Sequence, residues 1–225
     1  MEYKKLAFIL IFTFLVFISV YVPISRIAET SKYFTLYEFF GPLPAAFLGP
    51  LYGAIVVIVA RAITIFTATP EIGIFDIARI FTMVFATWYF ANYKKDKYLL
   101  IVPVIAMAMF IAHPVGQEAW VYSLYWLIPI VAYLLPNNLF FRSLGATFMA
   151  HAVGSIAFLY TFQTTPAYWL ALIPIVAVER AIFASGVAIS FIAVTTVLNK
   201  FFTDDKSINI EKGYVISSFA LKKKN

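Results

Sequence analysis

The sequence predicts an all-α fold: a polytopic helical bundle of six to eight transmembrane helices, with both termini in the cytoplasm. Hydrophobic residues make up 63% of the 225 residues and charged residues only 12%, whereas about 25% of a soluble domain is charged. The charges gather between apolar blocks that approach the roughly 20 residues a helix needs to cross a bilayer. Lipid is therefore the solvent that suits this composition.

Apolar blocks of this kind occupy most of the chain, and Pro or Gly residues mark most of the breaks between them. They predict a single transmembrane domain over residues 1–202, followed by a short cytoplasmic tail over 203–225 that touches anionic headgroups. The predicted spans are 6–25, 33–49, 51–68, 73–92, 98–114, 118–135, 141–162 and 168–200.

Three of these blocks need separate comment. The first follows Lys4 and Lys5 like a signal peptide, but its apolar run is too long for one and lacks a cleavage site, so it is predicted to be retained. Gly41-Pro42-Leu43-Pro44 interrupts the second block, which favours a broken or partly re-entrant helix. The last block exceeds one straight crossing, and we expect it to begin with an interfacial segment ahead of Pro174.

The orientation follows from the Lys and Arg residues, which favour the cytoplasmic side. The residues predicted to be cytoplasmic are Lys4 and Lys5, the cluster 94–97, Arg142 and the lysine-rich tail. The loops that lack Lys and Arg are predicted to be external, and they lie near 69–72, 113–118 and 163–167. The expected location is the cell membrane, crossed several times. The net charge of +6 is explained by these flanking residues and does not indicate a nucleic-acid partner.

No motif in the sequence indicates an enzyme. The chain has no cysteine, which excludes disulfides and thiolate chemistry. It contains no P-loop and no zinc-protease motif, and Ser155 after Gly154 does not complete a nucleophile elbow. His113 and Glu118 lack a third ligand nearby, so no metal and no cofactor are predicted.

Charged residues inside the predicted spans are the first candidates for function, since each costs about 2.5–3.5 kcal/mol at the bilayer centre. Arg61, Glu179 and Arg180 lie near the middle of their blocks. Neighbouring helix positions point about 100° apart, so we expect Glu179 to pair with Arg61 rather than with Arg180. This intramembrane pair either fixes the packing of two helices or contacts a substrate. Two other sites have default interpretations: a surface ion pair for Asp76–Arg79, and an interfacial position for Glu38.

A second polar group lies in the block 141–162. Thr147, His151 and Ser155 form one stripe at helical spacing. Ala146, Ala150 and Gly154 form an adjoining stripe of small residues, which is typical of close helix packing. His151 needs both a donor and an acceptor in lipid, so it is either a link between helices or a ligand contact.

The external loop gathers an imidazole, an amide, a carboxylate and an indole within eight residues, at His113, Gln117, Glu118 and Trp120. A second aromatic pair, Tyr168-Trp169, is expected at the same membrane boundary. This mixture resembles the lining of a small-molecule pocket, which is apolar with a few directed polar groups. The alternative is an aromatic belt beside a hydrated loop.

One segment of the chain resembles a known family. Phe39–Ala54, with the sequence FFGPLPAAFLGPLYGA, looks like a helical pair in the S components, the substrate-binding membrane subunits of energy-coupling-factor (ECF) vitamin transporters. A second similarity is to the layout of the family's last two helices. It covers Arg142, Gly145, His151 and Gly154, followed by Ile173-Pro174 and Glu179-Arg180. The first block departs from the family pattern because Ala7 is its only alanine.

The resemblance implies membrane-embedded binding of a vitamin or related small solute from the external side for uptake. Transport would then need a separate coupling subunit with cytoplasmic ATPases. The candidate substrate-binding residues are His113, Gln117, Glu118, Trp120, His151, Trp169 and Glu179. Two alternatives stay open: a stand-alone secondary transporter, with Arg61, His151 and Glu179 as an ion or proton relay, and a membrane sensor or assembly protein that transports nothing.

Overall fold

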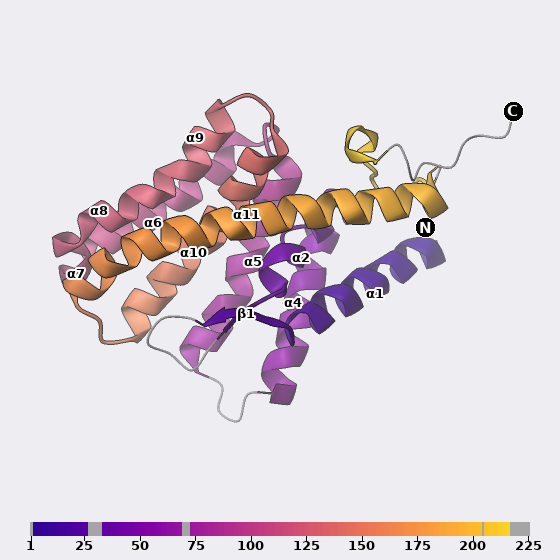
Figure 1. Ribbon diagram of the computed structural model, residues 1–225. Helices are drawn as coiled ribbons and strands as arrows, with labels where there is room; N and C mark the ends of the chain where they lie inside the picture. Colours follow the sequence, from indigo (N-terminus) through magenta and orange to yellow (C-terminus); the bar gives the residue numbers. More distant parts are fainter. Residues whose placement is uncertain (1, 27–32, 69–72, 204, 217–225) are drawn as a thin grey trace, which may run out of the picture.

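The computed structural model describes residues 2–26, 33–68, 73–203 and 205–216. In these ranges the chain is a helical bundle, and its only strands are a two-stranded antiparallel hairpin (Figure 1). Four helices are long and apolar enough to cross a membrane, which indicates a membrane protein. They are α4 (Pro50–Ala68), α5 (Ile74–Asn92), α10 (Leu139–Thr161) and α11 (Pro166–Phe202), and α1 (Glu2–Ser19) packs beside α4.

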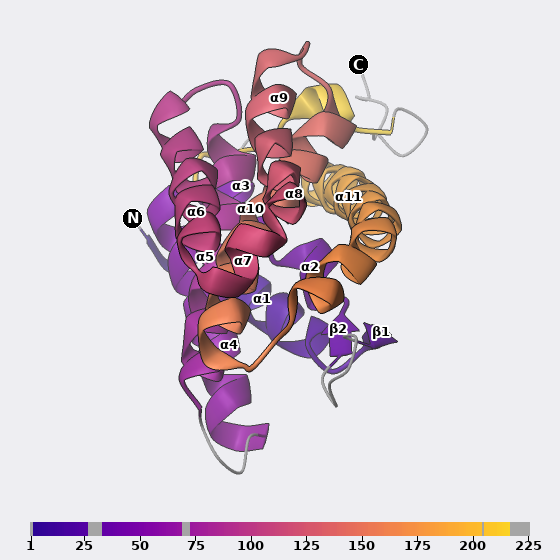
Figure 2. The same ribbon diagram turned by 90° about the vertical axis from the view of Figure 1, so that its left-hand side faces the viewer.

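Shorter helices account for the predicted blocks 98–114 and 118–135. The first block becomes η1 (Lys97–Leu100) and α6 (Ile101–Ala112). The chain then turns through α7 (Pro114–Glu118) and returns along three short segments that follow one another: α8 (Trp120–Ser123), η2 (Leu124–Leu127) and α9 (Ile128–Leu134). Figure 2 shows α6, α8 and α9 grouped on one side of the bundle, where α6 and α9 pack against α10.

The predicted span 33–49 is not one continuous helix. It begins with strand β2 (Tyr33–Thr35), which pairs with β1 (Pro23–Arg26), and continues as α2 (Tyr37–Phe40) and α3 (Pro44–Leu48). The break falls at the Gly41-Pro42 pair, as expected for a broken helix. All five residues of α3 are buried. Gly49 has a φ of +85°, which lets the chain reverse directly into α4.

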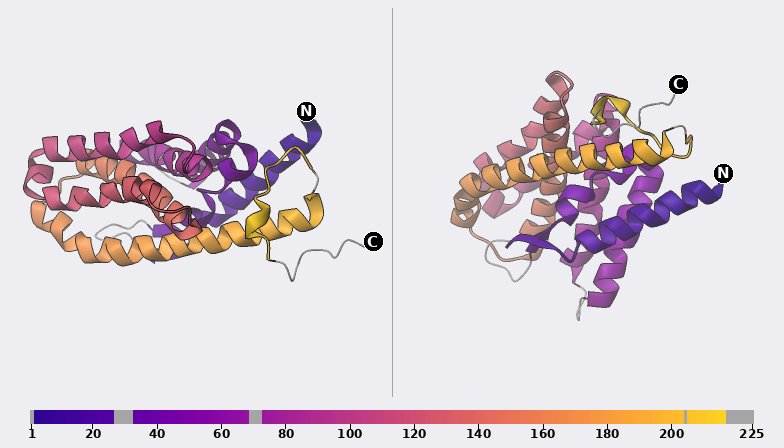
Figure 3. Two further views of the ribbon diagram at one scale, coloured as in Figure 1. Left: turned by 90° about the horizontal axis from the view of Figure 1, so that it is seen from above. Right: turned by 45° about the vertical axis from the view of Figure 1, so that its right-hand side comes forward.

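The predicted span 168–200 is one continuous helix, α11, of 37 residues, and its length is about 55 Å at 1.5 Å per residue. Pro174 lies inside the helix and does not end it, so residues 166–173 are the first turns of α11 and not a separate segment. Their interfacial position stays a prediction. Thr165 caps the first turn through its Oγ1, which accepts from the amide of Tyr168 at 3.3 Å. Seen from above in Figure 3, α11 runs along the whole molecule.

The interior consists of two hydrophobic clusters, and α10 and α11 contribute to both. One cluster holds Phe47, Phe90 and Phe191 among the helices from α1 to α5. The other is centred on Phe110 and Trp126, between α6, η2 and the first half of α11. Helices α10 and α5 approach each other closely, since a Cβ added to Gly145 would lie 2.3 Å from the Tyr89 hydroxyl. Of the predicted small-residue stripe, Ala146 and Ala150 are buried, and Gly154 faces α5, where an added Cβ would lie 3.5 Å from Thr82 Cγ2.

Within the described ranges, the basic residues that the sequence assigns to the cytoplasm lie at one end of the bundle, called here the basic end. Lys4 forms an ion pair with Asp205 at 3.2 Å, and the Lys5 ammonium lies 3.9 Å from the centre of the Tyr52 ring. Lys94 donates to backbone carbonyls at the end of α9. The β1–β2 hairpin lies at the opposite end of α1, and this side is called the hairpin end (Figure 1).

A large part of the predicted tail packs on the protein, and its expected contact with headgroups stays a prediction. Residues 205–216, including η3 (Lys212–Tyr214), pack on the basic end. Asn209 donates from its backbone to the carbonyl of Phe47 (2.8 Å) and from its side chain to that of Ala46 (3.0 Å). Ile208 is buried. Residues 217–225 lie outside the described part of the chain.

Candidate functional site

A cavity of about 150 Å³ lies between α2, α5, α8, α10 and α11, next to β2. Three helices each present one face to it. On α5 the lining residues are Phe75, Arg79 and Thr82, at the spacing i, i+4, i+7 that places side chains on one face. The same periodicity holds for α10 between positions 150 and 158 and for α11 between positions 168 and 180. The cavity is therefore built by the hairpin-end halves of three long helices.

One side of the cavity is aromatic. Phe158 stacks on Tyr168, with ring centroids 5.9 Å apart and an interplanar angle of 16°, and it meets Phe75 edge to face at 5.7 Å. Trp169 is 1% exposed, and its indole donates to Thr164 Oγ1 at 3.0 Å. Tyr122 packs against Trp169 at 4.9 Å. These rings form a firm apolar surface against which a planar group would stack.

Glu179 and Arg180 lie on the cavity wall and pair with each other. The Glu179 carboxylate accepts from the Arg180 guanidinium at 3.1 Å and from Ser25 Oγ at 3.4 Å. The expected pairing of Glu179 with Arg61 is therefore wrong. The Cα–Cβ bonds of Glu179 and Arg180 diverge, but both side chains are long enough to bend toward each other outside the helix and form their ion pair. Arg61 instead lies over the Tyr37 ring, 5.9 Å from its centroid.

Arg180 is anchored by aromatic rings as well as by this pair. Its guanidinium lies 4.9 Å from the Phe34 ring and 4.5 Å from the Phe183 ring, where cation–π attraction is favourable. The side chain is buried, and its Nε has no hydrogen-bond partner in the described ranges. Phe34 is on β2, so the hairpin contributes both a wall residue and a contact to the charged pair.

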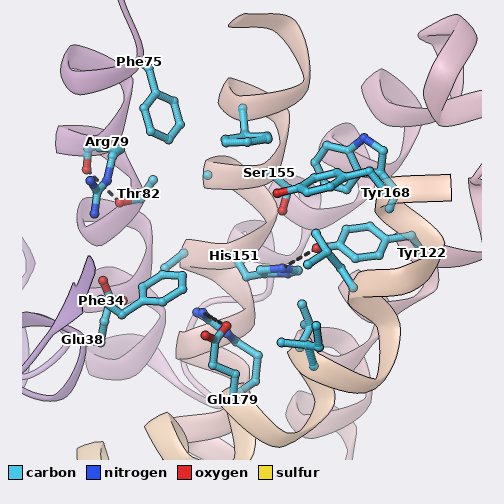
Figure 4. A pocket seen from close by; sticks show the side chains of 18 residues that line it. Phe34, Glu38, Phe75, Arg79, Thr82, Tyr122, His151, Ser155, Tyr168 and Glu179 are labelled. Atoms are coloured by element: carbon cyan, nitrogen blue, oxygen red, sulfur yellow. Dashed lines mark hydrogen bonds and ion pairs between the residues drawn. The ribbon is translucent and has the colours of Figure 1, made fainter. Parts of the chain in front are cut away.

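Glu38 and Arg79 also line the cavity, and neither forms an ion pair within the described part of the chain. Figure 4 shows both on the side formed by α2 and α5, across from Tyr168 and Tyr122. The default ion pair between Asp76 and Arg79 is not formed. Asp76 instead accepts from the Gly73 amide at the start of α5, at 3.4 Å, because a carboxylate in a first turn is favoured there.

His151 is held at both ring nitrogens. The Trp126 indole donates to its Nδ1 at 3.2 Å, and its Nε2 lies 2.9 Å from the Tyr122 hydroxyl. Because an indole only donates, Nδ1 accepts, and a neutral ring then carries its proton on Nε2. His151 therefore links α10 to η2 and α8, although its ring also borders the cavity. This agrees with the interpretation of His151 as a link between helices.

The structure divides the seven candidate substrate-binding residues. His151, Trp169 and Glu179 line the cavity. The other four, from the predicted external loop, lie outside it. His113 caps α7 by accepting from the amide of Val115 at 3.3 Å and packs on Tyr160. The remaining three are exposed at the surface: Gln117, Glu118 and Trp120.

Chain geometry explains why this loop turns away from the cavity. Gly116 sits so close to the end of α6 that a Cβ there would lie 1.9 Å from the carbonyl oxygen of Phe110. This tight turn directs the polar side chains of α7 outward. Within the described ranges, no three His, Asp or Glu side chains come together in a way that could hold a metal ion.

Sequence reasoning missed the two charged residues that face the cavity without an ion-pair partner among the described residues. Glu38 was interpreted as interfacial and Arg79 as half of a surface pair, because both lie near the ends of predicted spans. The signal was nevertheless present, since any ionisable residue in an apolar block needs a partner or a function. Phe75 and Phe158 carried no such signal, because phenylalanine is common throughout the chain.

The chain was compared with protein-family models, with curated proteins and with solved structures, and none of the three comparisons finds a match. The functional argument therefore rests on the cavity and on the residues that line it.

Proposed function

We propose that this chain is a multi-pass protein of the cell membrane that binds a small solute in its cavity from the external side. The direction of access is supported by the basic end. The positive-inside rule assigns that end to the cytoplasm, and the cavity is lined by the opposite, hairpin-end halves of α5, α10 and α11. A solute from outside the cell would then reach the cavity without crossing the sealed half of the bundle.

The observation that carries this proposal is the composition of the cavity wall. Ligand sites are typically apolar with a few convergent polar groups, and here aromatic rings face the carboxylates and guanidinium groups of four charged residues. Charges in an apolar bundle are costly, so a group of them around an open volume supports a binding role. Tight helix packing alone would favour a filled interior at this position.

The resemblance to S components extends this proposal to uptake, with a separate coupling subunit and ATPases as partners. The break between α2 and α3, followed by the reversal at Gly49, is compatible with the helical pair on which the resemblance rests. The relay required by a secondary transporter receives no such support. Arg61, His151 and Glu179 each contact other partners: Tyr37, Tyr122 with Trp126, and Arg180.

Native mass spectrometry of the detergent-purified protein, with extraction of retained small molecules, tests the binding function. We expect one solute per chain and a higher melting temperature when that solute is added back. Copurification from native membranes would test for the coupling subunit and ATPases. A protein that retains no solute and whose melting temperature no vitamin or amino acid shifts would contradict the proposal.

A further inference from the structure

The four charged residues of the cavity wall are not equivalent. Glu179 and Arg180 neutralise each other at 3.1 Å. Glu38 and Arg79 face the same volume, and neither has an ion-pair partner among the described residues. Partly buried charges without a counter-charge are unfavourable, and an evolved interior tends to remove them unless they have a use. The wall therefore presents one carboxylate and one guanidinium that no ion pair among the described residues neutralises, although the Arg79 guanidinium also lies 5.8 Å from the centre of the Phe75 ring.

We propose that the cavity binds a compact zwitterion, whose anionic group contacts Arg79 and whose cationic group contacts Glu38. This inference rests on the proposed binding function and names its ligand class. A guanidinium binds a carboxylate through two parallel hydrogen bonds, and a carboxylate accepts readily from an ammonium group. Both charges lie on one side of the cavity in Figure 4, so the ligand's two charged groups are expected at the same end.

The charge count favours a zwitterion over a simple ion. Glu38 and Glu179 contribute two negative charges to the wall, and Arg79 and Arg180 two positive charges. An anion would satisfy Arg79 and leave Glu38 buried more deeply without a partner. A cation would do the reverse. Only a ligand with both charges satisfies the wall, because each group left unpaired costs the free energy of its desolvation.

The remaining walls define the uncharged part of the ligand. A cavity of about 150 Å³ is comparable with an engineered apolar cavity that holds benzene. Tyr168 lies across from Glu38 and Arg79 in Figure 4, and Phe158 stacks on Tyr168. Phe75 lies beside Arg79 and meets Phe158 edge to face, so these three rings border the space left for the ligand's body. The expected body is therefore a single planar ring or a similarly small apolar group, joined to the charged end by a short linker.

Binding of matched probes to the purified full-length protein tests the proposal by calorimetry. Two zwitterions carry both charged groups at one end of the molecule, with different spacings between them: L-phenylalanine and 3-amino-3-phenylpropanoate. Each is compared with its analogue lacking the amine and its analogue lacking the carboxylate. We expect at least one zwitterion to bind about 10- to 100-fold more tightly than both of its analogues, the usual range for one charged hydrogen bond.

Two variants assign the groups. Arg79→Gln should weaken the zwitterion about 10- to 100-fold and leave the amine-only analogue unaffected, and Glu38→Gln should show the reverse selectivity. The control Glu118→Gln makes the same chemical change as Glu38→Gln, but on an exposed side chain outside the cavity. It should change the affinity of neither the zwitterion nor its analogues. A structural role would instead lower the melting temperature of the ligand-free Arg79→Gln and Glu38→Gln variants, without changing which analogue is preferred.

The outcomes separate this inference from the function on which it rests. The proposal of a zwitterionic ligand is wrong if single-charge analogues bind as tightly as every zwitterion, or if the retained solute is neutral or singly charged. The proposal of solute binding stands in either case. If no solute is retained and no probe binds, both proposals fail.

Discussion

Arg142 at the basic end and Arg79 beside the cavity are arginines of the same bundle in opposite situations. Arg142 is 5% exposed, donates to both carboxylate oxygens of Glu211 at 2.9 Å and stacks over the Phe90 ring at 4.1 Å. Arg79 lies over Phe75 at 5.8 Å and has no ion pair in the described ranges. At the basic end, charged side chains form ion pairs with residues of the tail. At the hairpin end, Glu38 and Arg79 face the cavity instead.

This difference indicates a division of labour within one fold. At the basic end, residues 205–216 bring backbone and side-chain partners to α3, α10 and α11, so polar groups there are satisfied by the protein itself. At the hairpin end, the satisfying groups are expected to come from a ligand. Under the proposed function, the basic end serves stability and the hairpin end serves binding, as expected where binding sites carry unfavourable charges.

The largest effect is expected when Glu211 is replaced by Ala. The guanidinium of Arg142 would remain buried without its counter-charge, which costs about 3–5 kcal/mol for a buried pair. Unfolding in detergent, followed by circular dichroism, measures the loss. Lys206→Ala, on an exposed side chain of the same segment, is the control and should change stability little. An unchanged midpoint for Glu211→Ala would contradict the idea that the tail locks the basic end.

Glu179→Gln should destabilise the protein by about 2 kcal/mol, because it leaves Arg180, which is 2% exposed, without its negative partner. If the chain is a passive binding subunit, as proposed, the only functional effect of Glu179→Gln is a change in solute affinity, because uptake does not depend on a proton gradient. The melting temperature and solute affinity of the variant are the two measurements. If Glu179→Gln abolished uptake driven by a proton gradient, the chain would instead be a secondary transporter.

Asn209→Ala should cost about 1–2 kcal/mol, because its side chain donates to the carbonyl of Ala46, next to the buried turn of α3. The stability of the basic end can be read from hydrogen exchange of the amides in residues 205–216. We expect faster exchange there and no change in solute affinity. A loss of affinity would show that the two halves are coupled rather than independent.

Glu38→Gln and Arg79→Gln should leave the ligand-free protein as stable as the parent chain, or slightly more stable. Each removes a partly buried charge that lacks an ion-pair partner in the described ranges, so a penalty is lifted and no pair is broken. Thermal melting without ligand measures this. A clear loss of stability would mean that these charges hold the fold together, as Arg142 and Glu211 do.

The smallest effect concerns pH at the basic end. The pKa of Asp205 is lowered from its ordinary value of 3.8, chiefly because the Ser207 amide donates to the carboxylate at 2.8 Å, with Lys4 as a further partner. A lowered folded-state pKa means that its contribution to stability is present above about pH 4 and is lost as the pH falls further. Asp205→Asn should remove this part of the acid dependence of unfolding, and an identical acid profile would contradict it.

Much of the bundle could be predicted from local sequence. Long apolar blocks with flanking Pro and Gly locate α4, α5 and α10 to within about two residues, because length and hydrophobicity are properties of a single segment. The gathering of basic residues at one end also follows from their alternation along the chain. The break between α2 and α3 was signalled by Gly41-Pro42, although the strand ahead of it was not, because a hairpin depends on its pairing partner.

The partners of the charges could not be predicted in the same way. Helical spacing argued for Arg61 with Glu179 and for Asp76 with Arg79, and neither pair forms, since reach and burial depend on neighbouring helices. The external loop drew attention through its composition, but the tight turn at Gly116 points it away from the cavity. Composition shows which residues are costly in lipid, and it does not show which of them meet.

The sequence by itself determined that this is a helical protein suited to lipid, with its basic residues at one end and costly charges inside, because solvent preference and helix length are read residue by residue. The tertiary structure alone decided that residues 205–216 close the basic end and that Arg142 pairs with Glu211. It also decided that Glu38 and Arg79 share a cavity. Those outcomes join residues far apart in the chain, and only the packing of the helices sets the distances between them.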